Sequence, residues 1–314
     1  MREIVDKFLK SKWVTGFIAF LKRIKPIGFA GLSVYQVSRF FIEGLQKGAI
    51  TTRAAAIAFR LFLAFFPLLI VLLSLIPFIP VENFQENLFN SIRDVFPGDT
   101  FQLVESTLDD LINKTHSTVL SIGFVLALYY ASNSINALLI GFNGSYHLDQ
   151  KGNPIIMRVF SFGLMLVLGA FIILAVVLIM FSGSAISYLK EIEILPDGGI
   201  ILLLDFARWG ISIALIYFSI TILFNVGESG RRKWRWFTAG AGFATFLFIL
   251  GSLAFAWFVN NLAQFNKLYG SIGTLIIFLI WTNFNAFILL LGFDLNTSIK
   301  RAKVDYLQHE NLTT

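Results

Sequence analysis

The sequence predicts an all-α membrane protein, a bundle of six transmembrane helices. Of its 314 residues, 56% are hydrophobic and 14% are charged, whereas ordinary globular chains carry about 25% charged residues. Six separate apolar runs approach or exceed the roughly 20 residues that an α-helix needs to cross a hydrocarbon core. Lysine and arginine also collect in the segments on one side of these runs. Together these observations indicate a polytopic membrane protein.

Residues 1–50 are expected to form amphipathic helices in the cytoplasm or at the membrane interface. Apolar residues recur at helical spacing from Ile4 to Ile24 among lysines and arginines, and Pro26 and Gly28 end this pattern. A second amphipathic helix is expected over residues 32–45. Basic amphipathic helices bind the interface of an anionic leaflet. The alternative is that both helices pack on the cytoplasmic ends of the bundle.

The membrane domain is expected at residues 51–298, and its first span at about 54–79. Arg60 is the only charged residue in this span. Alanines near its start, including Ala54 and Ala58, form a small-residue surface that a neighbouring helix can approach closely. Pro67 removes a backbone hydrogen bond, which is tolerated where neighbouring helices satisfy the freed carbonyl. The first span is therefore expected inside the bundle.

A polar insert at residues 81–117 follows the first span. Two short amphipathic segments flank a turn at Phe96, Pro97 and Gly98, so the insert is expected to form a small extracytoplasmic helical hairpin. Its carboxylates, from Glu82 to Asp110, would give that hairpin an acidic outer surface.

Five further spans are expected, followed by a cytoplasmic tail at residues 299–314. The spans lie at about 118–140, 159–182, 200–224, 238–259 and 271–294. Gly240 and Ala244 stand four residues apart in the fifth span, which predicts a close contact with another helix.

The distribution of positive charge predicts that both termini are cytoplasmic. Nineteen lysines and arginines fall in the segments 1–53, 141–158, 225–237 and 295–314, against four in the segments on the opposite side. Cytoplasmic loops carry this excess in membrane proteins. The basic run from Arg231 to Trp236 is interpreted as a cytoplasmic anchor with tryptophan at headgroup level, rather than as an RNA-binding patch.

Arg60 leads a group of polar residues that we expect to line a hydrated pocket. It lies roughly 10 Å from the cytoplasmic edge, at the limit of what an arginine side chain can reach. Polar residues of other spans, Asn225 and Asn296 among them, share that depth, and Asp294 is the expected counter-ion. The candidate pocket residues are Arg60, Asn133, Asn136, Asn143, Asn283, Asn285 and Asp294. The alternative is that these side chains hydrogen-bond between helices and only hold the bundle together.

Asp205 and Arg208 form a candidate ion pair within the fourth span. They stand three residues apart on one helical face, so their charges can neutralise each other. A pair of this kind lets a helix insert into the membrane without implying a functional site.

The sequence offers little to support an enzyme. The histidines, His116, His147 and His309, are widely separated and have no carboxylate at metal-ligand spacing. No glycine-rich phosphate loop or nucleophile-elbow pattern occurs. With no cysteine, thiolate metal sites and disulfides are also excluded. We therefore expect no enzymatic activity and no cofactor or metal.

Three stretches carry a resemblance to a known family. They are RAAAIAF with FFPLLIVLLSLI in the first span, SINALLIGFNGSYH at the end of the second, and YGSIGTLIIFLIWTNFNAFILLLGFDLN at residues 269–296. They resemble the YihY/BrkB family of bacterial inner-membrane proteins, formerly named ribonuclease BN, over about residues 53–298. The resemblance implies six spans. This chain departs from the family pattern at Arg60, where members usually have an aromatic residue.

The function expected from these observations is transport or export of a small or amphiphilic solute across the bacterial cytoplasmic membrane. The polar pocket in the cytoplasmic half would bind the solute. The alternative is an envelope scaffold or lipid-organising protein that transports nothing. Membrane lipids and an unidentified solute are the expected partners, a homo-oligomer is a candidate assembly, and nucleic acid is not expected.

Overall fold

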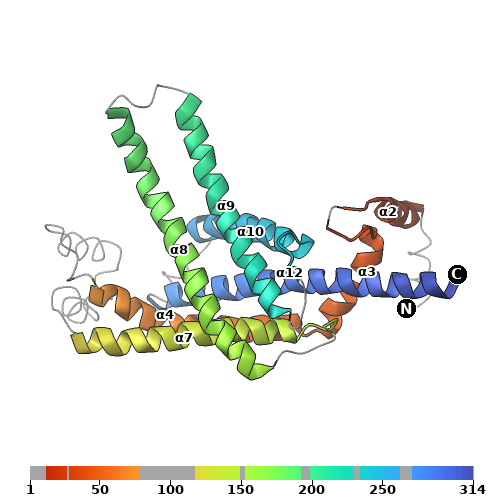
Figure 1. The fold of residues 1–314 in the computed structure, drawn as a ribbon, viewed down its shortest axis with the longest axis horizontal. Coiled ribbons are helices and arrows are strands. Elements are labelled where there is room, and N and C mark those ends of the chain that lie inside the picture. Colours follow the sequence, from red (N-terminus) through yellow and green to blue (C-terminus); the bar gives the residue numbers. More distant parts are fainter. Residues whose placement is uncertain are drawn as a thin grey trace. The chain divides into compact units, whose positions relative to one another are not determined.

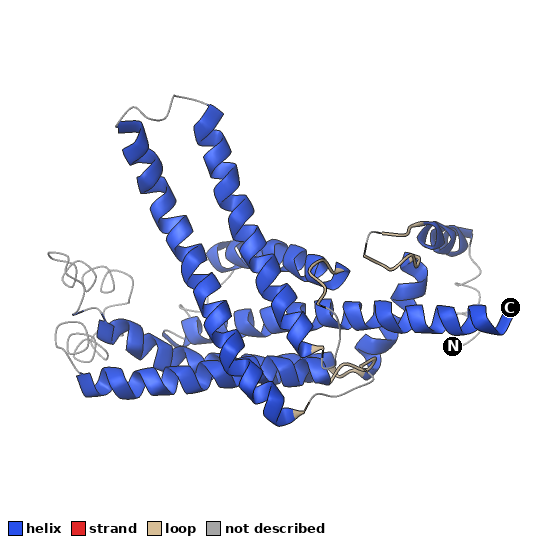
Figure 2. Cartoon of the chain, viewed as in Figure 1, coloured by secondary structure: helices blue, strands red, loops and turns tan. Residues whose placement is uncertain are grey.

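The computed structural model of the chain describes residues 12–26, 28–75, 77, 117–148, 153–191, 199–228, 234–261 and 271–313. All regular secondary structure in this part of the chain is helical, and it contains no strand (Figure 2). The predicted all-α fold class is confirmed. The insert at residues 81–117 lies outside the described residues apart from Ser117, so its helical hairpin stays a prediction.

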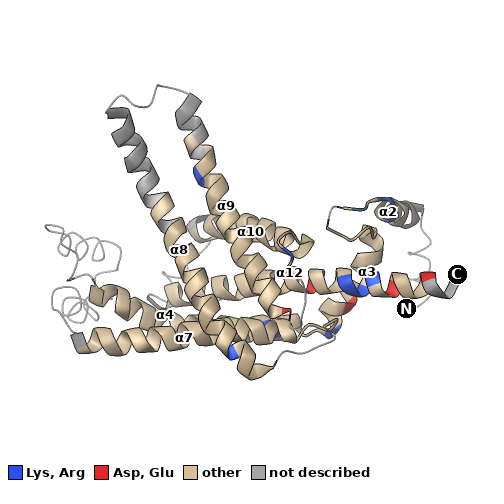
Figure 3. Ribbon diagram, viewed as in Figure 1, with Lys and Arg blue, Asp and Glu red and all other residues tan. Residues whose placement is uncertain are grey.

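Six of the described helices are long and apolar enough to cross a membrane. Figure 1 labels them α4 (Ile50–Leu75), α7 (Ser117–Asn143), α8 (Pro154–Glu191), α9 (Gly199–Gly227), α10 (Ala239–Asn261) and α12 (Ser271–Thr313). Each corresponds to one predicted span. Charged residues are sparse along most of their length, while the C-terminal part of α12 carries several (Figure 3).

Two of these helices run well past the predicted ends of their spans. At about 1.5 Å per residue, α8 with 38 residues and α12 with 43 residues are roughly 57 and 64 Å long. Both exceed a hydrocarbon core of about 30 Å. The sequence prediction followed the apolar run, and a helix can continue beyond that run where its polar residues meet water or protein.

The chain divides into two compact units. Unit 1 contains Met1–Thr51, Leu139–Phe248 and Ile288–Thr314, and unit 2 contains Thr52–Leu138 and Ile249–Phe287. Unit 1 therefore includes α8, α9, the beginning of α10 and the C-terminal part of α12. Within it, α8 packs against α9.

Unit 1 also contains the short helices α2 (Lys12–Arg23) and α3 (Val34–Lys47), which contact each other. Helix α3 begins after Ser33, whose hydroxyl accepts a hydrogen bond from the backbone N–H of Gln36. The Gln36 side chain in turn accepts from the N–H of Ser33 at 2.9 Å. This reciprocal arrangement is a capping box, which satisfies backbone donors that the first helical turn leaves open.

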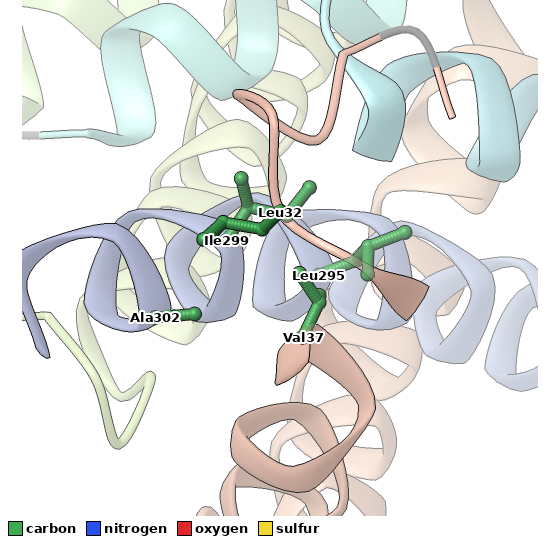
Figure 4. Close-up of a cluster of buried hydrophobic side chains, with 5 residues drawn as sticks. All are labelled: Leu32, Val37, Leu295, Ile299 and Ala302. Atoms are coloured by element: carbon green, nitrogen blue, oxygen red, sulfur yellow. The ribbon is translucent and has the colours of Figure 1, made fainter. Parts of the chain in front are cut away.

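A buried cluster joins α3 to the C-terminal part of α12. It consists of Leu32, Val37, Leu295, Ile299 and Ala302 (Figure 4). Val37 is 1% exposed, and Phe243 of α10 packs against the same cluster. Helix α3 therefore packs on α12, and its position at the membrane interface stays a prediction.

Helices α10 and α12 cross closely within unit 1. A Cβ atom on Gly240 would collide with the carbonyl oxygen of Gly292, and a Cβ atom on Gly292 would lie 2.6 Å from that of Ala244. Only glycine allows the two backbones to approach this far. The helix contact predicted from Gly240 and Ala244 is confirmed.

Unit 2 is built from most of α4 and α7 with the end of α10 and the first part of α12. Pro67 lies inside α4 as predicted. The ring of Phe65 in α4 lies 4.5 Å from that of Phe278 in α12, and Phe255 in α10 lies 4.7 Å from Trp281 in α12. Aromatic contacts thus join α12 to both α4 and α10.

Candidate functional site

Arg60 lies in α4 and is half-buried. Its backbone carbonyl accepts a hydrogen bond from the hydroxyl of Ser134 in α7, with 2.8 Å between the oxygens. The same hydroxyl lies 2.9 Å from the carbonyl oxygen of Tyr130. Because Ser134 is 2% exposed, this polar contact fixes α7 against α4 at the level of Arg60.

Asn133 and Asn136 flank Ser134 in α7, and both are half-buried. At about 100° of rotation per residue, Asn133 lies roughly 100° and Asn136 roughly 160° around the helix from Ser134. Ser134, which was not among the predicted pocket residues, therefore occupies the face of α7 that meets α4. The pocket that includes both asparagines stays a prediction.

Asn283 and Asn285 lie in the part of α12 that belongs to unit 2, and both are half-buried. The amide nitrogen of Asn285 donates to the carbonyl of Trp281 at 2.8 Å. Its amide oxygen is buried and has no hydrogen-bond partner among the described residues. A buried polar atom of this kind costs free energy unless water, a ligand or another protein group satisfies it.

The two remaining candidate pocket residues, Asn143 and Asp294, belong to unit 1. The Asn143 amide donates to the carbonyl of Leu139 at 2.8 Å and lies 3.3 Å from the sulfur of Met157 in α8. Asp294 is 2% exposed. Arg60 and Asp294 belong to different units, so their pairing as ion and counter-ion stays a prediction.

Hydroxyl groups surround the helical turn that contains Asp294. The hydroxyls of Thr297 and Ser298 donate to its backbone carbonyl at 3.0 and 2.6 Å. Thr297 also lies 3.0 Å from the hydroxyl of Ser145, which follows α7. The turn is therefore tied to the loop between α7 and α8.

The ion pair predicted within α9 is only partly covered by the structure. Arg208 is half-buried, and its guanidinium lies 5.9 Å from the ring centroid of Trp209. The side chain of Asp205 lies outside the described residues. The pairing of Asp205 with Arg208 stays a prediction.

Unit 1 contains a network of polar contacts that the sequence did not predict. The Asn296 amide oxygen accepts from the N–H of Gly240 at 2.8 Å, and its nitrogen donates to the hydroxyl of Thr238 at 3.1 Å. Asn296 thereby caps the first turn of α10 from another helix. Asn225 accepts from the N–H of Arg235 at 3.0 Å and donates to its carbonyl at 3.1 Å.

Glu228 and Lys300 complete this network as an ion pair whose side chains are 20% and 18% exposed. Beside it lies a cavity of about 20 Å³, lined by Asn225, Thr238 and Asn296 among others. A polar space of this size holds about one water molecule. Asn225 and Asn296 were visible in the sequence as polar residues, but their partners are mostly backbone atoms.

The loop after α7 forms a second polar contact at this end of unit 1. His147 Nε2 lies 2.7 Å from the carbonyl oxygen of Phe40 in α3. Lys47 lies 2.7 Å from a Glu43 carboxylate oxygen and 3.2 Å from the Tyr146 hydroxyl. The hydrogen bond between Lys47 and Glu43 lowers the pKa of the Glu43 carboxyl and raises the pKa of Lys47.

Comparison with known proteins identifies the family. Residues 41–313 match the family model described as virulence factor BrkB. The chain belongs to the BrkB family. The resemblance found in the sequence is thereby confirmed, and the match includes the part of α12 beyond the predicted last span.

Relatives of this BrkB-family chain cover most of its length. The ribonuclease-like protein YfkH of Bacillus subtilis is 27% identical over 80% of this chain and 90% of YfkH. A UPF0761 membrane protein of Aggregatibacter aphrophilus is 25% identical, covering 81% of this chain and 88% of the relative. Another UPF0761 membrane protein, from Haemophilus influenzae, is 24% identical, covering 85% of this chain and 96% of the relative. No solved structure matches.

The family and the six apolar helices identify a multi-pass bacterial membrane protein. Within the parts of the chain described above, no group of three or more His, Cys, Asp or Glu side chains is arranged to hold a metal ion.

Proposed function

We propose that this BrkB-family protein transports or exports a small or amphiphilic solute across the bacterial cytoplasmic membrane. Both termini would lie in the cytoplasm, and the solute would bind in a polar pocket in the cytoplasmic half of the bundle. The observation that carries the proposal is the half-buried Arg60 within an apolar helix. A charged residue at the centre of a membrane helix costs about 2.5–3.5 kcal/mol or more, and such residues tend to mark substrate and ion pathways.

The buried amide oxygen of Asn285 gives the proposal further support. It belongs to unit 2, as does Arg60, and has no partner among the described residues. A polar solute or water in a pocket would satisfy this oxygen. A closely packed scaffold offers no reason to keep an unsatisfied acceptor within a membrane helix.

Contacts within unit 1 support the proposal that both termini lie on the same side of the membrane. The four segments that carry the excess of lysine and arginine meet one another there. The segment before α4 packs on the end of α12, and His147 contacts Phe40. Glu228, which follows α9, pairs with Lys300 of α12. Segments that share one side of a membrane can make such contacts, whereas segments on opposite sides cannot.

A specific observation favours the alternative of a lipid-organising protein. Trp234, Trp236 and Phe237, just before α10, are 54%, 50% and 79% exposed. Exposed aromatic residues at the end of a span lie at headgroup level in membrane proteins. They would contact lipid in either function, so transport must be measured directly.

We expect no enzymatic activity, ribonuclease activity included. The three histidines are far apart in the sequence, and no carboxylate accompanies them at metal-ligand spacing. The term ribonuclease-like belongs to the name of the relative YfkH. Incubation of the purified protein with RNA should leave the RNA intact, and cleavage that copurifies with the protein would contradict this expectation.

Transport is tested with the purified protein reconstituted in lipid vesicles and a broad panel of small and amphiphilic solutes. The wild-type protein should move at least one of them. Arg60→Ala should slow that movement by about tenfold or more, because hydrogen bonds to charged groups contribute roughly 1.5–3 kcal/mol. Arg60→Lys, which keeps the positive charge, should retain part of the activity.

Phe59→Ala is the matched control, since Phe59 neighbours Arg60 in α4 but is 58% exposed. It should transport as the wild type does. Folded protein that moves no solute would overturn the proposal, and so would an Arg60→Ala variant with unchanged transport. The lipid-organising alternative would then be favoured.

A further inference from the structure

A pocket of about 500 Å³ lies between the loop that leads into α10 and the C-terminal part of α12. Its basic lining residues are Arg235, Lys300 and Lys303, and we call it the basic pocket. Ile299, Val304 and Leu307 supply apolar lining. None of the described residues that line it is acidic. The pocket thus presents positive charge next to an apolar surface.

Two of the three cations come from positions that the fold holds in place. The backbone of Arg235 is held by both amide atoms of Asn225, at 3.0 and 3.1 Å. Lys300 pairs with Glu228. Glu228 offsets one positive charge, so Arg235 and Lys303 leave the pocket with a net positive charge.

The contact between Gly240 and Gly292 indicates where the basic pocket lies relative to the apolar layer of the membrane. Gly240 is the second residue of α10, where the apolar span begins. Lys300 stands eight residues beyond Gly292, or roughly 12 Å farther along the helix axis. The lysine therefore lies outside the apolar layer, on the side of the membrane where α10 begins.

Aromatic residues indicate the same depth from the other side of the pocket. Trp234 and Trp236 flank Arg235 and are about half exposed, at 54% and 50%. Their rings lie 5.8 Å apart. Tryptophan concentrates at the membrane interface, where its ring can contact both acyl chains and water.

We propose that the basic pocket binds the phosphate group of an anionic phospholipid. Arg235, Lys300 and Lys303 contact the phosphate, and the apolar lining residues contact the adjoining glycerol and upper acyl region. A free phosphate ion would use the cations but would leave the exposed side chains of Val304 and Leu307 without a partner. This inference is independent of the proposed transport, because no candidate residue of the transport pocket lines the basic pocket.

Native mass spectrometry of the full-length protein in neutral detergent tests this proposal. Phosphatidylglycerol and phosphatidylcholine are titrated separately, and inorganic phosphate is added as a competitor. Phosphatidylglycerol should bind more tightly than phosphatidylcholine. Lys303→Gln should weaken phosphatidylglycerol binding by about fivefold, and Lys303→Gln with Arg235→Gln by roughly 25-fold, since each basic residue contributes about a factor of five near a membrane surface.

Arg301→Gln provides a matched control. Arg301 is exposed, lies two residues from Lys303 in the same helix and does not line the basic pocket. Its replacement should leave phosphatidylglycerol binding close to the wild-type value. Equal losses in Arg301→Gln and Lys303→Gln would overturn the proposal in favour of general surface attraction. Displacement of the lipid by inorganic phosphate at matched concentration would overturn it in favour of a free phosphate site.

Discussion

Asn296 shows how a single side chain can organise a helix start in a membrane protein. Its amide binds both the N–H of Gly240 and the hydroxyl of Thr238. The first N–H groups of a helix have no partner within that helix. In an apolar surrounding they must be satisfied by other protein groups. Asn296 supplies one such partner from α12.

Replacing Asn296 with alanine should therefore destabilise the protein. The expected loss is about 1–2 kcal/mol, as for removal of other helix caps. Asn296→Asp keeps an acceptor for Gly240 but loses the amide donor, so it should cost less. Thermal melting of the purified protein in detergent measures the effect.

Gln308→Ala is a control in the same helix, because Gln308 is exposed. It should melt within the error of the wild type. Equal melting temperatures for Asn296→Ala and Gln308→Ala would refute the capping role of Asn296.

At the scale of the element, the crossing of α10 and α12 depends on two glycines. The backbone of Gly240 meets that of Gly292 without an intervening side chain. Dispersion contacts and close backbone approach drive helix association in lipid, where apolar surface gains little from leaving the solvent. A methyl group at this crossing would push the helices apart.

Gly240→Ala should lower stability by about 1–3 kcal/mol, the usual cost of overpacking. Gly242→Ala, two residues later in α10, is the matched control because a Cβ atom there would meet nothing within 4 Å. It should be neutral or stabilise the helix by up to about 1 kcal/mol. Both variants are compared by thermal melting in detergent. Equal destabilisation by both would contradict the account of the crossing.

The same two helices show what the sequence could predict. The spacing of Gly240 and Ala244 predicted a close helix contact, and the structure contains it. Gly292 could not be assigned as the partner, because spacing within one helix does not identify the helix it meets. The full length of α12 was also missed, since hydropathy reports the apolar part of a helix and not its end.

The candidate site was less predictable than the fold. Asn225 and Asn296 were recognisable as polar residues near the ends of spans, yet they bind backbone atoms of Arg235 and Gly240. Backbone partners leave no signature in the side-chain pattern. Glu228 and Lys300 are far apart in the sequence, and only the packing of the chain brings them together.

At the scale of the whole molecule, the topology that we propose has six membrane crossings and leaves both ends of the chain on one side. The six apolar helices provide the crossings. The cluster of Leu32 and Val37 with Leu295 and Ile299 joins the segment before the first span to the end of the last one. The excess of lysine and arginine predicts that this side faces the cytoplasm.

Cysteine labelling in intact cells tests this topology most directly, because the chain has no cysteine that would react in the background. Single variants Lys12→Cys, Glu105→Cys and Glu310→Cys are exposed to a membrane-impermeant maleimide before and after permeabilisation. We expect Glu105→Cys, in the insert, to react in intact cells, and the other two variants to react only after permeabilisation. Labelling of either terminal variant in intact cells, or protection of Glu105→Cys there, would contradict this topology.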